Sequence, residues 1–188
     1  MQLPYRDIPG VVSANALAEH YQLYRRYVEQ LRVIDQAIPT ANFTGANAIA
    51  GPARSLYQGQ SYAVAAVELH EAYFGNLVRT PTRVTAENRA IQKIAARWGS
   101  LEGWWREMSA AALASRGWVV LALCPKGTLR VLGLDEHDVG AAFGCNVLCA
   151  IDVYEHAYWS DFGVNKALYL ERIVKHLDWN AIAGRIRA

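Results

Sequence analysis

The sequence predicts an α+β protein in which a hairpin of two long helices precedes a region with a three-stranded antiparallel sheet and further helices. Three observations favour this class. Apolar residues recur at helical spacing through much of the first eighty residues. Short apolar runs joined by a tight turn follow after residue 116, as expected of strands. Thr80-Pro81-Thr82 separates the two patterns, so we expect domains at residues 1–80 and 81–188.

The first helix is expected to begin after the N-cap residue Ser13 and to end near Ile38. Its apolar stripe contains Leu17, His20, Tyr24, Leu31 and either Tyr27 or Val28. A connector rich in Gly and Pro, residues 39–59, leads to a second helix from Ser61. The stripe of that helix contains Ala63, Val67, His70, Phe74 and Leu77. His20 and His70 therefore lie on apolar faces, where an ordinary core histidine is the alternative interpretation.

The C-terminal half is expected to open with helices at residues 86–98 and 101–114. Gly99 can end the first of these in a left-handed conformation while Ser100 caps the second. Strands are expected at 117–124 and 128–132 around a Pro-Lys-Gly turn, and a third at 145–151. Closing helices are expected at 165–176 and 179–186.

Composition narrows the classes of partner. The chain has 188 residues, long enough for a substantial core, and a net charge of +2 with no basic stripe, so no nucleic-acid partner is expected. No apolar run reaches the roughly eighteen residues of a membrane helix, and the N-terminus lacks a signal-peptide pattern. Cys124, Cys145 and Cys149 lie in apolar runs and are expected to be buried reduced thiols. We therefore expect a soluble cytoplasmic protein without a membrane partner.

Asp152 and His156 are the first candidates for chemistry. They stand four residues apart, directly after the run expected to form the third strand. An Asp oxygen together with a His nitrogen suits manganese or iron, whereas thiolate-rich sites favour other metals. The alternative is that Asp152 caps a helix and His156 is a core histidine.

Residues 152–159, Asp-Val-Tyr-Glu-His-Ala-Tyr-Trp, resemble the Asp-x-Trp-Glu-His-Ala-Tyr-Tyr motif of the iron/manganese superoxide dismutases. Residues 70–74 are similar to the family's His-x-x-Phe-Trp, and residues 3–5 to its Leu-Pro-Tyr. The resemblance covers nearly the whole chain. It implies one iron or manganese ion per chain that disproportionates superoxide. The implied protein ligands are His20, His70, Asp152 and His156, with one position left open for solvent.

The register of the first helix has two solutions. Alignment on Ser13, Leu17 and His20 resembles the family's first helix and gives an imidazole ligand on the apolar stripe. Alignment on the Tyr27-Val28 pair would instead place Glu19 at the ligand position. We prefer His20, because it keeps more of the pattern in register.

The resemblance also implies a proton route. The family's first helix reads His-x-x-x-His-x-x-x-Tyr, and its second histidine and tyrosine form the gate to the metal. That spacing here gives Tyr24 and Val28, and valine carries no proton. His137 falls where the family places the residue that bonds the metal-bound solvent, so we expect the route to use Tyr24 or His137. Tyr27 is expected to point about 100° away from the direction of Val28.

Glu155 precedes the last ligand, as the family's glutamate does, and implies a homodimer in which it reaches the partner's ligand histidine. Three functions stay open. The first is a superoxide dismutase, and the second an iron or manganese oxidase or oxygenase that acts on an organic substrate. The third is a non-catalytic dimeric metal-binding protein. The sequence does not choose between iron and manganese.

Overall fold

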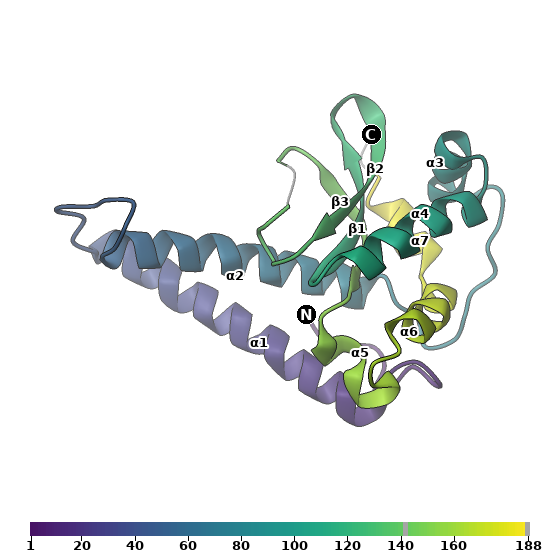
Figure 1. Ribbon diagram of the computed structural model, residues 1–188, viewed down its shortest axis with the longest axis horizontal. Helices are drawn as coiled ribbons and strands as arrows, with labels where there is room; N and C mark the ends of the chain where they lie inside the picture. Colours follow the sequence, from purple (N-terminus) through teal and green to yellow (C-terminus); the bar gives the residue numbers. More distant parts are fainter. Residues whose placement is uncertain (141–142, 187–188) are drawn as a thin grey trace.

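The computed structural model describes residues 1–140 and 143–186, and its architecture confirms the α+β class (Figure 1). Two long helices come first, α1 (Ala14–Ala37) and α2 (Pro52–Gly75). Two shorter helices follow, α3 (Arg89–Trp98) and α4 (Leu101–Ala114). The strands are β1 (Trp118–Cys124), β2 (Thr128–Leu134) and β3 (Asn146–Asp152). The chain closes with α5 (Glu155–Phe162), α6 (Lys166–Ile173) and α7 (Trp179–Gly184).

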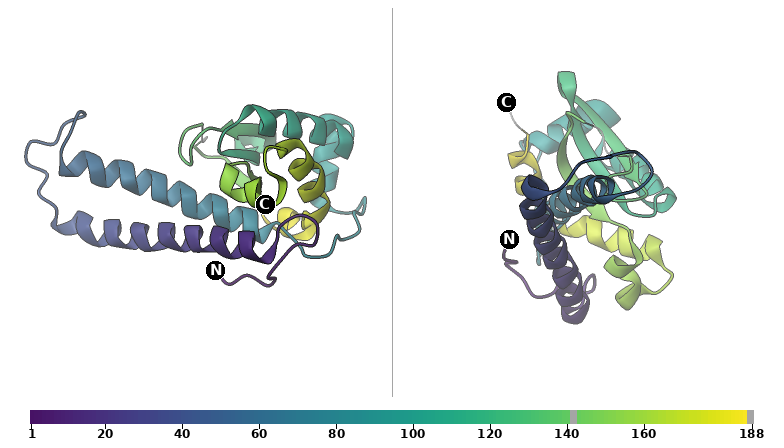
Figure 2. Two further views of the ribbon diagram at one scale, coloured as in Figure 1. Left: turned by 60° about the horizontal axis from the view of Figure 1, so that its bottom comes forward. Right: turned by 90° about the vertical axis from the view of Figure 1, so that its left-hand side faces the viewer.

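The helical hairpin extends well beyond the rest of the molecule at its loop end (Figures 1 and 2). The hydroxyl of Ser13 caps α1 by accepting a hydrogen bond from the Ala16 amide, as expected. The predicted start of α2 at Ser61 is wrong, because the helix begins at Pro52. Proline suits the first helical turn, where its missing N–H has no partner to lose. The extra turns lie in the exposed end of the hairpin, so no buried stripe marks them in the sequence.

The sheet has the order β2-β1-β3, with all neighbours antiparallel. Its central strand β1 is buried over nearly its whole length. Strands β2 and β3 flank it, α4 packs on β1 and β2, and α2 packs on β3. Trp118, the first residue of β1, pairs with Asp152, the last residue of β3. Because β3 also packs on α2, its last residue lies beside the inner part of the helical hairpin.

The cysteines differ from expectation. Cys124 and Cys145 form a disulfide, so the prediction of reduced thiols is wrong for this pair. The strand register explains the bond: Leu123 pairs with Asn146, which sets Cys124 opposite Cys145 with their Cα atoms 4.0 Å apart. Cys149 is a free buried thiol, and its burial raises its pKa to about 12.

The helix boundaries of the C-terminal region are close to those predicted. Gly99 ends α3 with a φ of +79°, and the hydroxyl of Ser100 accepts a hydrogen bond from the Gly103 amide at the start of α4. None of the helices that the structure describes is long and apolar enough to cross a membrane. The division into domains at residue 80 stays a prediction.

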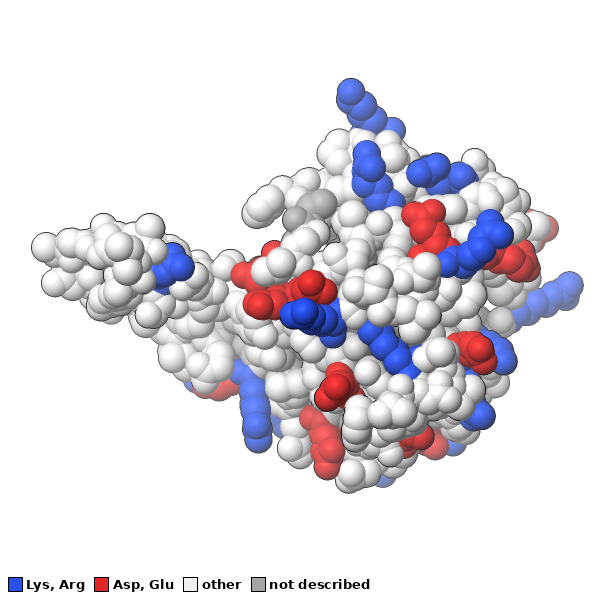
Figure 3. Space-filling model, viewed as in Figure 1, with Lys and Arg blue, Asp and Glu red and all other residues white. Residues whose placement is uncertain are grey.

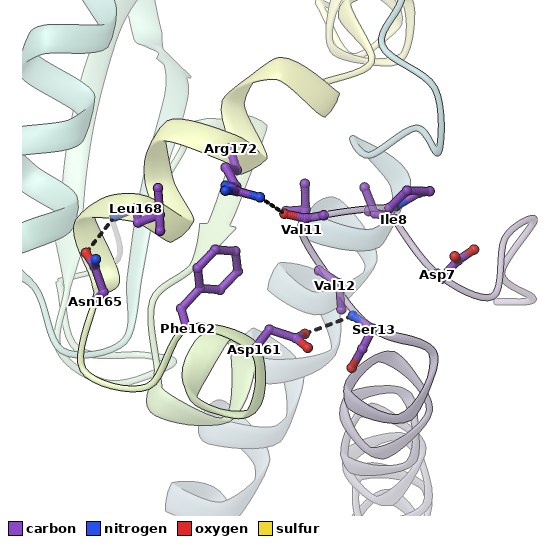
Figure 4. Close-up of a pocket in the computed structure, with 12 residues that line it drawn as sticks. Asp7, Ile8, Val11, Val12, Ser13, Asp161, Phe162, Asn165, Leu168 and Arg172 are labelled. Atoms are coloured by element: carbon purple, nitrogen blue, oxygen red, sulfur yellow. Dashed lines mark hydrogen bonds between the residues drawn. The ribbon is translucent and has the colours of Figure 1, made fainter.

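The N-terminal arm joins the first helix to the last part of the chain. The amide of Ser13 donates to the Asp161 carboxylate of α5 at 2.8 Å, and Arg172 of α6 donates to the carbonyl of Gly10 at 2.9 Å (Figure 4). These contacts hold α5 and α6 against the start of α1. They therefore help to fix the position of His156, which lies in the first turn of α5.

Candidate metal centre

Four side chains from four separate elements meet where the hairpin touches the sheet. His20 comes from α1, His70 from α2, Asp152 from the end of β3 and His156 from the first turn of α5. Each offers one ligand atom, and these atoms all lie within 4.8 Å of one another. Glu19, the alternative in the other register, is exposed and accepts a hydrogen bond from the side chain of Asn15.

A single carboxylate oxygen lies at the middle of this cluster. Asp152 Oδ2 is 3.0 Å from His20 Nε2, 3.1 Å from His156 Nε2 and 3.8 Å from His70 Nε2. The other oxygen, Oδ1, accepts a hydrogen bond from the Tyr154 amide at 2.9 Å. That bond fixes the orientation of the carboxylate and leaves Oδ2 facing the three imidazoles.

Each of the two helical histidines points its Nε2 atom at the cluster. His70 Nδ1–H donates to the carbonyl of Ala66 at 2.7 Å, so in the neutral ring the Nε2 lone pair faces the cluster. Only three buried side-chain polar atoms of the described residues lack a partner: His20 Nε2, His70 Nε2 and Trp104 Nε1. Unpartnered buried polar groups are rare because they cost free energy. Two of them aimed at one carboxylate fit a site built for a cation.

The protonation states of the cluster favour such an ion. Burial lowers the pKa of His20 and brings that of His70 to about 3, so both rings are neutral at physiological pH. Burial alone would raise the pKa of Asp152, but the nearby imidazoles of His156 and His20 hold it well below its usual range. The same carboxylate raises the pKa of His156, against the effect of that residue's own burial. The cluster therefore combines neutral nitrogen donors with one fixed negative charge, the donor set that iron and manganese accept.

His137 is fully buried beside the cluster. The indole N–H of Trp118 donates to His137 Nδ1 at 2.9 Å, so the ring proton of the neutral imidazole is on Nε2. That nitrogen faces the hydroxyl of Tyr27 at 3.2 Å and donates to it. Burial lowers the pKa of His137 to about 4, which keeps this arrangement at neutral pH.

Tyr27 lies beside the cluster, although the spacing of the family's motif had favoured Val28 for the gate position. Its ring centroid is 5.6 Å from that of His70, whereas Val28 is 40% exposed. Val28 therefore does not take the gate position predicted for it, and Tyr27, which points about 100° away from Val28, faces the cluster instead. Seven residues of α-helix return to within about 20° of the starting direction, while eight residues turn to about 80° from it. Counting from His20, the helix geometry alone selects Tyr27.

Tyr24 and Glu155 lie near the cluster without bonding to it. Tyr24 is buried, and its hydroxyl donates to the carboxylate of Glu71 at 2.7 Å, which links α1 to α2. Glu155 is exposed in the first turn of α5. The neighbouring surface includes Trp159, which is 48% exposed, and the His156 side chain, which is 32% exposed.

Two other surface features lie apart from the cluster. A cavity of about 470 Å³ between the N-terminal arm and α5–α6 has none of the four cluster residues in its lining (Figure 4). Figure 3 shows acidic and basic side chains interspersed on the face in view, without a large area of one sign.

Comparison with known proteins gives a consistent result. Residues 86–185 match the family described as iron/manganese superoxide dismutases, C-terminal domain. The iron superoxide dismutase of Aquifex pyrophilus is 33% identical over 180 residues, which cover 93% of this chain and 84% of that protein. The corresponding protein of Aquifex aeolicus is 32% identical over the same shares. A manganese superoxide dismutase of Halobacterium salinarum is 38% identical over 93 residues, 49% of this chain and 46% of its own length.

Proposed function

The chain belongs to the iron/manganese superoxide dismutase family, and from that premise we propose that its cluster is the active site of a superoxide dismutase. As a family member it is an oxidoreductase that takes one iron or manganese ion. We assign His20, His70, Asp152 and His156 as the ligands. The observation that carries the proposal is the convergence of two unpartnered imidazole nitrogens on the buried Asp152 carboxylate.

The four side chains supply binding and charge. An iron or manganese ion held by them would supply one-electron redox chemistry. Asp152 contributes the negative charge that offsets part of the ion's charge, and the buried rings of His20 and His70 keep water from competing for its ligand positions. The Tyr154 amide and the Ala66 carbonyl orient two of the ligands, a role in which such outer contacts commonly change affinity or activity by about 10- to 100-fold.

Tyr27 and His137 are the groups we propose for proton delivery. His137 donates its Nε2 proton to the Tyr27 oxygen, so the hydrogen of the Tyr27 hydroxyl points away from His137. The ring of Tyr27 lies beside that of His70, which supports a role for Tyr27 at the cluster. We prefer Tyr27 to Tyr24, which was expected to act in the relay, because the Tyr24 hydroxyl donates to the Glu71 carboxylate.

A symmetric homodimer is the assembly we propose, with Glu155 in the interface. The partly exposed His156 and the exposed Trp159 next to Glu155 support it, since a partner would cover both. Sedimentation of the wild type and of Glu155→Ala tests this proposal. A wild-type monomer with full metal content would contradict it. A cytoplasmic location also stays a proposal, which cell fractionation tests.

The names of the relatives favour dismutation over the oxidase and the non-catalytic binding protein. The test is to load the purified protein separately with iron and with manganese and to measure metal content and superoxide disproportionation together. We expect about one ion per chain and catalysis with at least one metal. One ion per chain without disproportionation would favour the oxidase or the non-catalytic metal-binding protein. Absence of metal binding would overturn the ligand assignment.

A further inference from the structure

His137 is surrounded by aromatic side chains that come from different parts of the chain. Trp118 and Tyr27 hydrogen-bond to its two ring nitrogens. The ring of Tyr62 packs edge-on against the imidazole, with centroids 4.6 Å apart, and the ring of Tyr154 lies at 5.2 Å. Tyr62 comes from α2 and is half-buried. Tyr27 and Tyr62, one from each helix of the hairpin, therefore meet at this imidazole.

The hydrogen bonds of His137 limit what it can pass on. Its Nδ1 accepts the indole N–H of Trp118, and its Nε2 donates to the Tyr27 oxygen. If Nε2 gave up its proton, the ring would become an anion unless Nδ1 gained one. Trp118 cannot supply that proton, because its indole is a hydrogen-bond donor that does not titrate. His137 can therefore hold the Tyr27 oxygen in place, but a proton that Tyr27 gives up must be replaced from elsewhere.

Tyr62 is a neighbour of Tyr27 that can replace this proton. The two rings lie 6.1 Å apart and are inclined at 60°. Burial raises the pKa of Tyr27, and Tyr62 raises it further, both through its charge when ionised and through hydrogen bonding. The hydroxyl of Tyr154, by contrast, donates to the carbonyl of Asp135 at 3.5 Å. Because a phenol is both donor and acceptor, Tyr62 can give a proton to Tyr27 and take one from water.

We propose that Tyr62 is a positioning residue for the Tyr27 hydroxyl and returns a proton to it after each delivery. This role rests on the proposed function of Tyr27. Once Tyr27 has given up its proton, the O–H bond of Tyr62 breaks as that of Tyr27 re-forms, and a proton from solvent then restores Tyr62. No electron moves in this exchange. His137 keeps its hydrogen bond to the Tyr27 oxygen throughout.

The first test uses metal-free protein, so that it does not depend on catalysis. Tyr62→Phe removes one hydroxyl and keeps the ring that packs on His137. The carbon-13 resonance of Tyr27 Cζ, assigned with Tyr27→Phe, should shift in this variant, because its hydroxyl loses a neighbour. The indole N–H resonance of Trp118 should stay in place and so report that His137 has not moved. An unmoved Tyr27 resonance would overturn the proposal, since the two hydroxyls would then not interact.

The second test compares the steady-state kinetics of the metal-loaded wild type and Tyr62→Phe. Resupply follows the first delivery, so its loss limits turnover at high superoxide but not the first encounter. We expect kcat to fall about 10-fold, less than the usual loss for a direct proton donor, because water can still reach the half-buried Tyr27. The ratio kcat/KM should stay the same, whereas a displaced cluster would lower both. Ammonium buffer, a small proton donor, should restore part of the lost kcat, which a purely structural role would not allow.

Tyr57→Phe is the matched control on the same helix. Tyr57 is 51% exposed and stacks on Phe43, so its hydroxyl should affect neither the Tyr27 resonance nor kcat. If the wild type dismutates superoxide and Tyr62→Phe has the same kcat, the role of Tyr62 is wrong while the proposed function stands. If the metal-loaded wild type does not dismutate superoxide, the proposed function fails and the resupply role fails with it.

Discussion

The helical hairpin and the C-terminal region contribute to the metal centre in opposite ways. The hairpin provides His20 and His70, whose burial lowers their pKa values and keeps them neutral. The C-terminal region provides Asp152 and His156, whose contact lowers the pKa of the carboxyl and raises that of the imidazole. One half therefore offers neutral imidazoles, and the other pairs a carboxylate with an imidazole whose pKa that carboxylate raises.

This difference shows how a buried site can stay intact without its ion. If all three imidazoles were protonated, their positive charges would repel one another. Two of them must therefore stay neutral. The hairpin achieves this through desolvation, while the Asp152 carboxylate satisfies the third imidazole.

Removing the charge should have the largest effect. Asp152→Asn keeps the size of the side chain but leaves no anion in the cluster, so we expect metal content to fall by more than the roughly 100-fold seen for outer contacts. Metal analysis after dialysis measures this, with His20→Gln as the matched change in the neutral half. If Asp152→Asn retained the ion, the negative charge of the C-terminal region would not be needed to hold it.

The second largest effect is expected in the pH dependence of unfolding, which should differ between the hairpin and the C-terminal region. Below pH 6.5 the unfolded chain protonates the equivalents of His20 and His70, while the folded-state pKa of each ring is lowered, to about 3 for His70. The metal-free protein should therefore lose about 1.4 kcal/mol per pH unit through His70 as pH falls from 6.5 towards 4, and the lowered pKa of His20 adds to this loss. His137, with a pKa lowered to about 4, adds to the same loss.

His156 acts in the other direction. Its raised pKa contributes stability that is fully present below pH 6.5 and is lost as pH rises through the folded-state value. Urea unfolding between pH 5 and 8 measures both limbs. His70→Gln should reduce the slope of the acid limb by about 1.4 kcal/mol per pH unit. An unchanged slope would show that burial does not hold His70 neutral.

Tyr27→Phe should have a smaller, purely kinetic effect. The change removes one hydroxyl beside the cluster, so metal content should stay the same while turnover falls by about 10- to 100-fold. Steady-state disproportionation with both metals checks this. Equal turnover in the variant and the wild type would exclude Tyr27 as the proton donor.

Tyr24→Phe is its matched control on the same helix and should have the smallest effect. It removes the hydrogen bond to Glu71, whose carboxylate is exposed and can be rehydrated, so we expect a loss of about 1 kcal/mol in the free energy of unfolding. Turnover should change little. A larger loss of turnover than in Tyr27→Phe would restore Tyr24 to the proton route.

Much of the fold could be predicted because its elements carry strong local patterns. The caps at Ser13 and Ser100 and the alternation of strand and turn after residue 116 need only neighbouring residues. The start of α2 at Pro52 could not be placed this way, since its first turns bury little. The disulfide was missed for another reason: it follows from the pairing of β1 with β3, a register that the sequence does not state.

The candidate site was predicted unevenly. His20 and His70 lie on apolar stripes, where spacing alone favours a core histidine, and only the family resemblance joined them to Asp152 and His156. The ligand assignment itself stays a proposal. Tyr27 was misplaced because the family's spacing was preferred to the 100° step of the helix, and the step gave the right face.

The separation of the four cluster residues along the chain has a consequence for biosynthesis. Roughly eighty residues lie between His70 and Asp152, so at about 5–20 residues per second the helical half is made some 4–16 s before the carboxylate. In that interval the nascent chain offers two imidazoles and no charge, a pair that prefers copper and zinc to iron or manganese by the usual order of affinities. The site can therefore favour iron or manganese only after Asp152 has joined the two helical imidazoles.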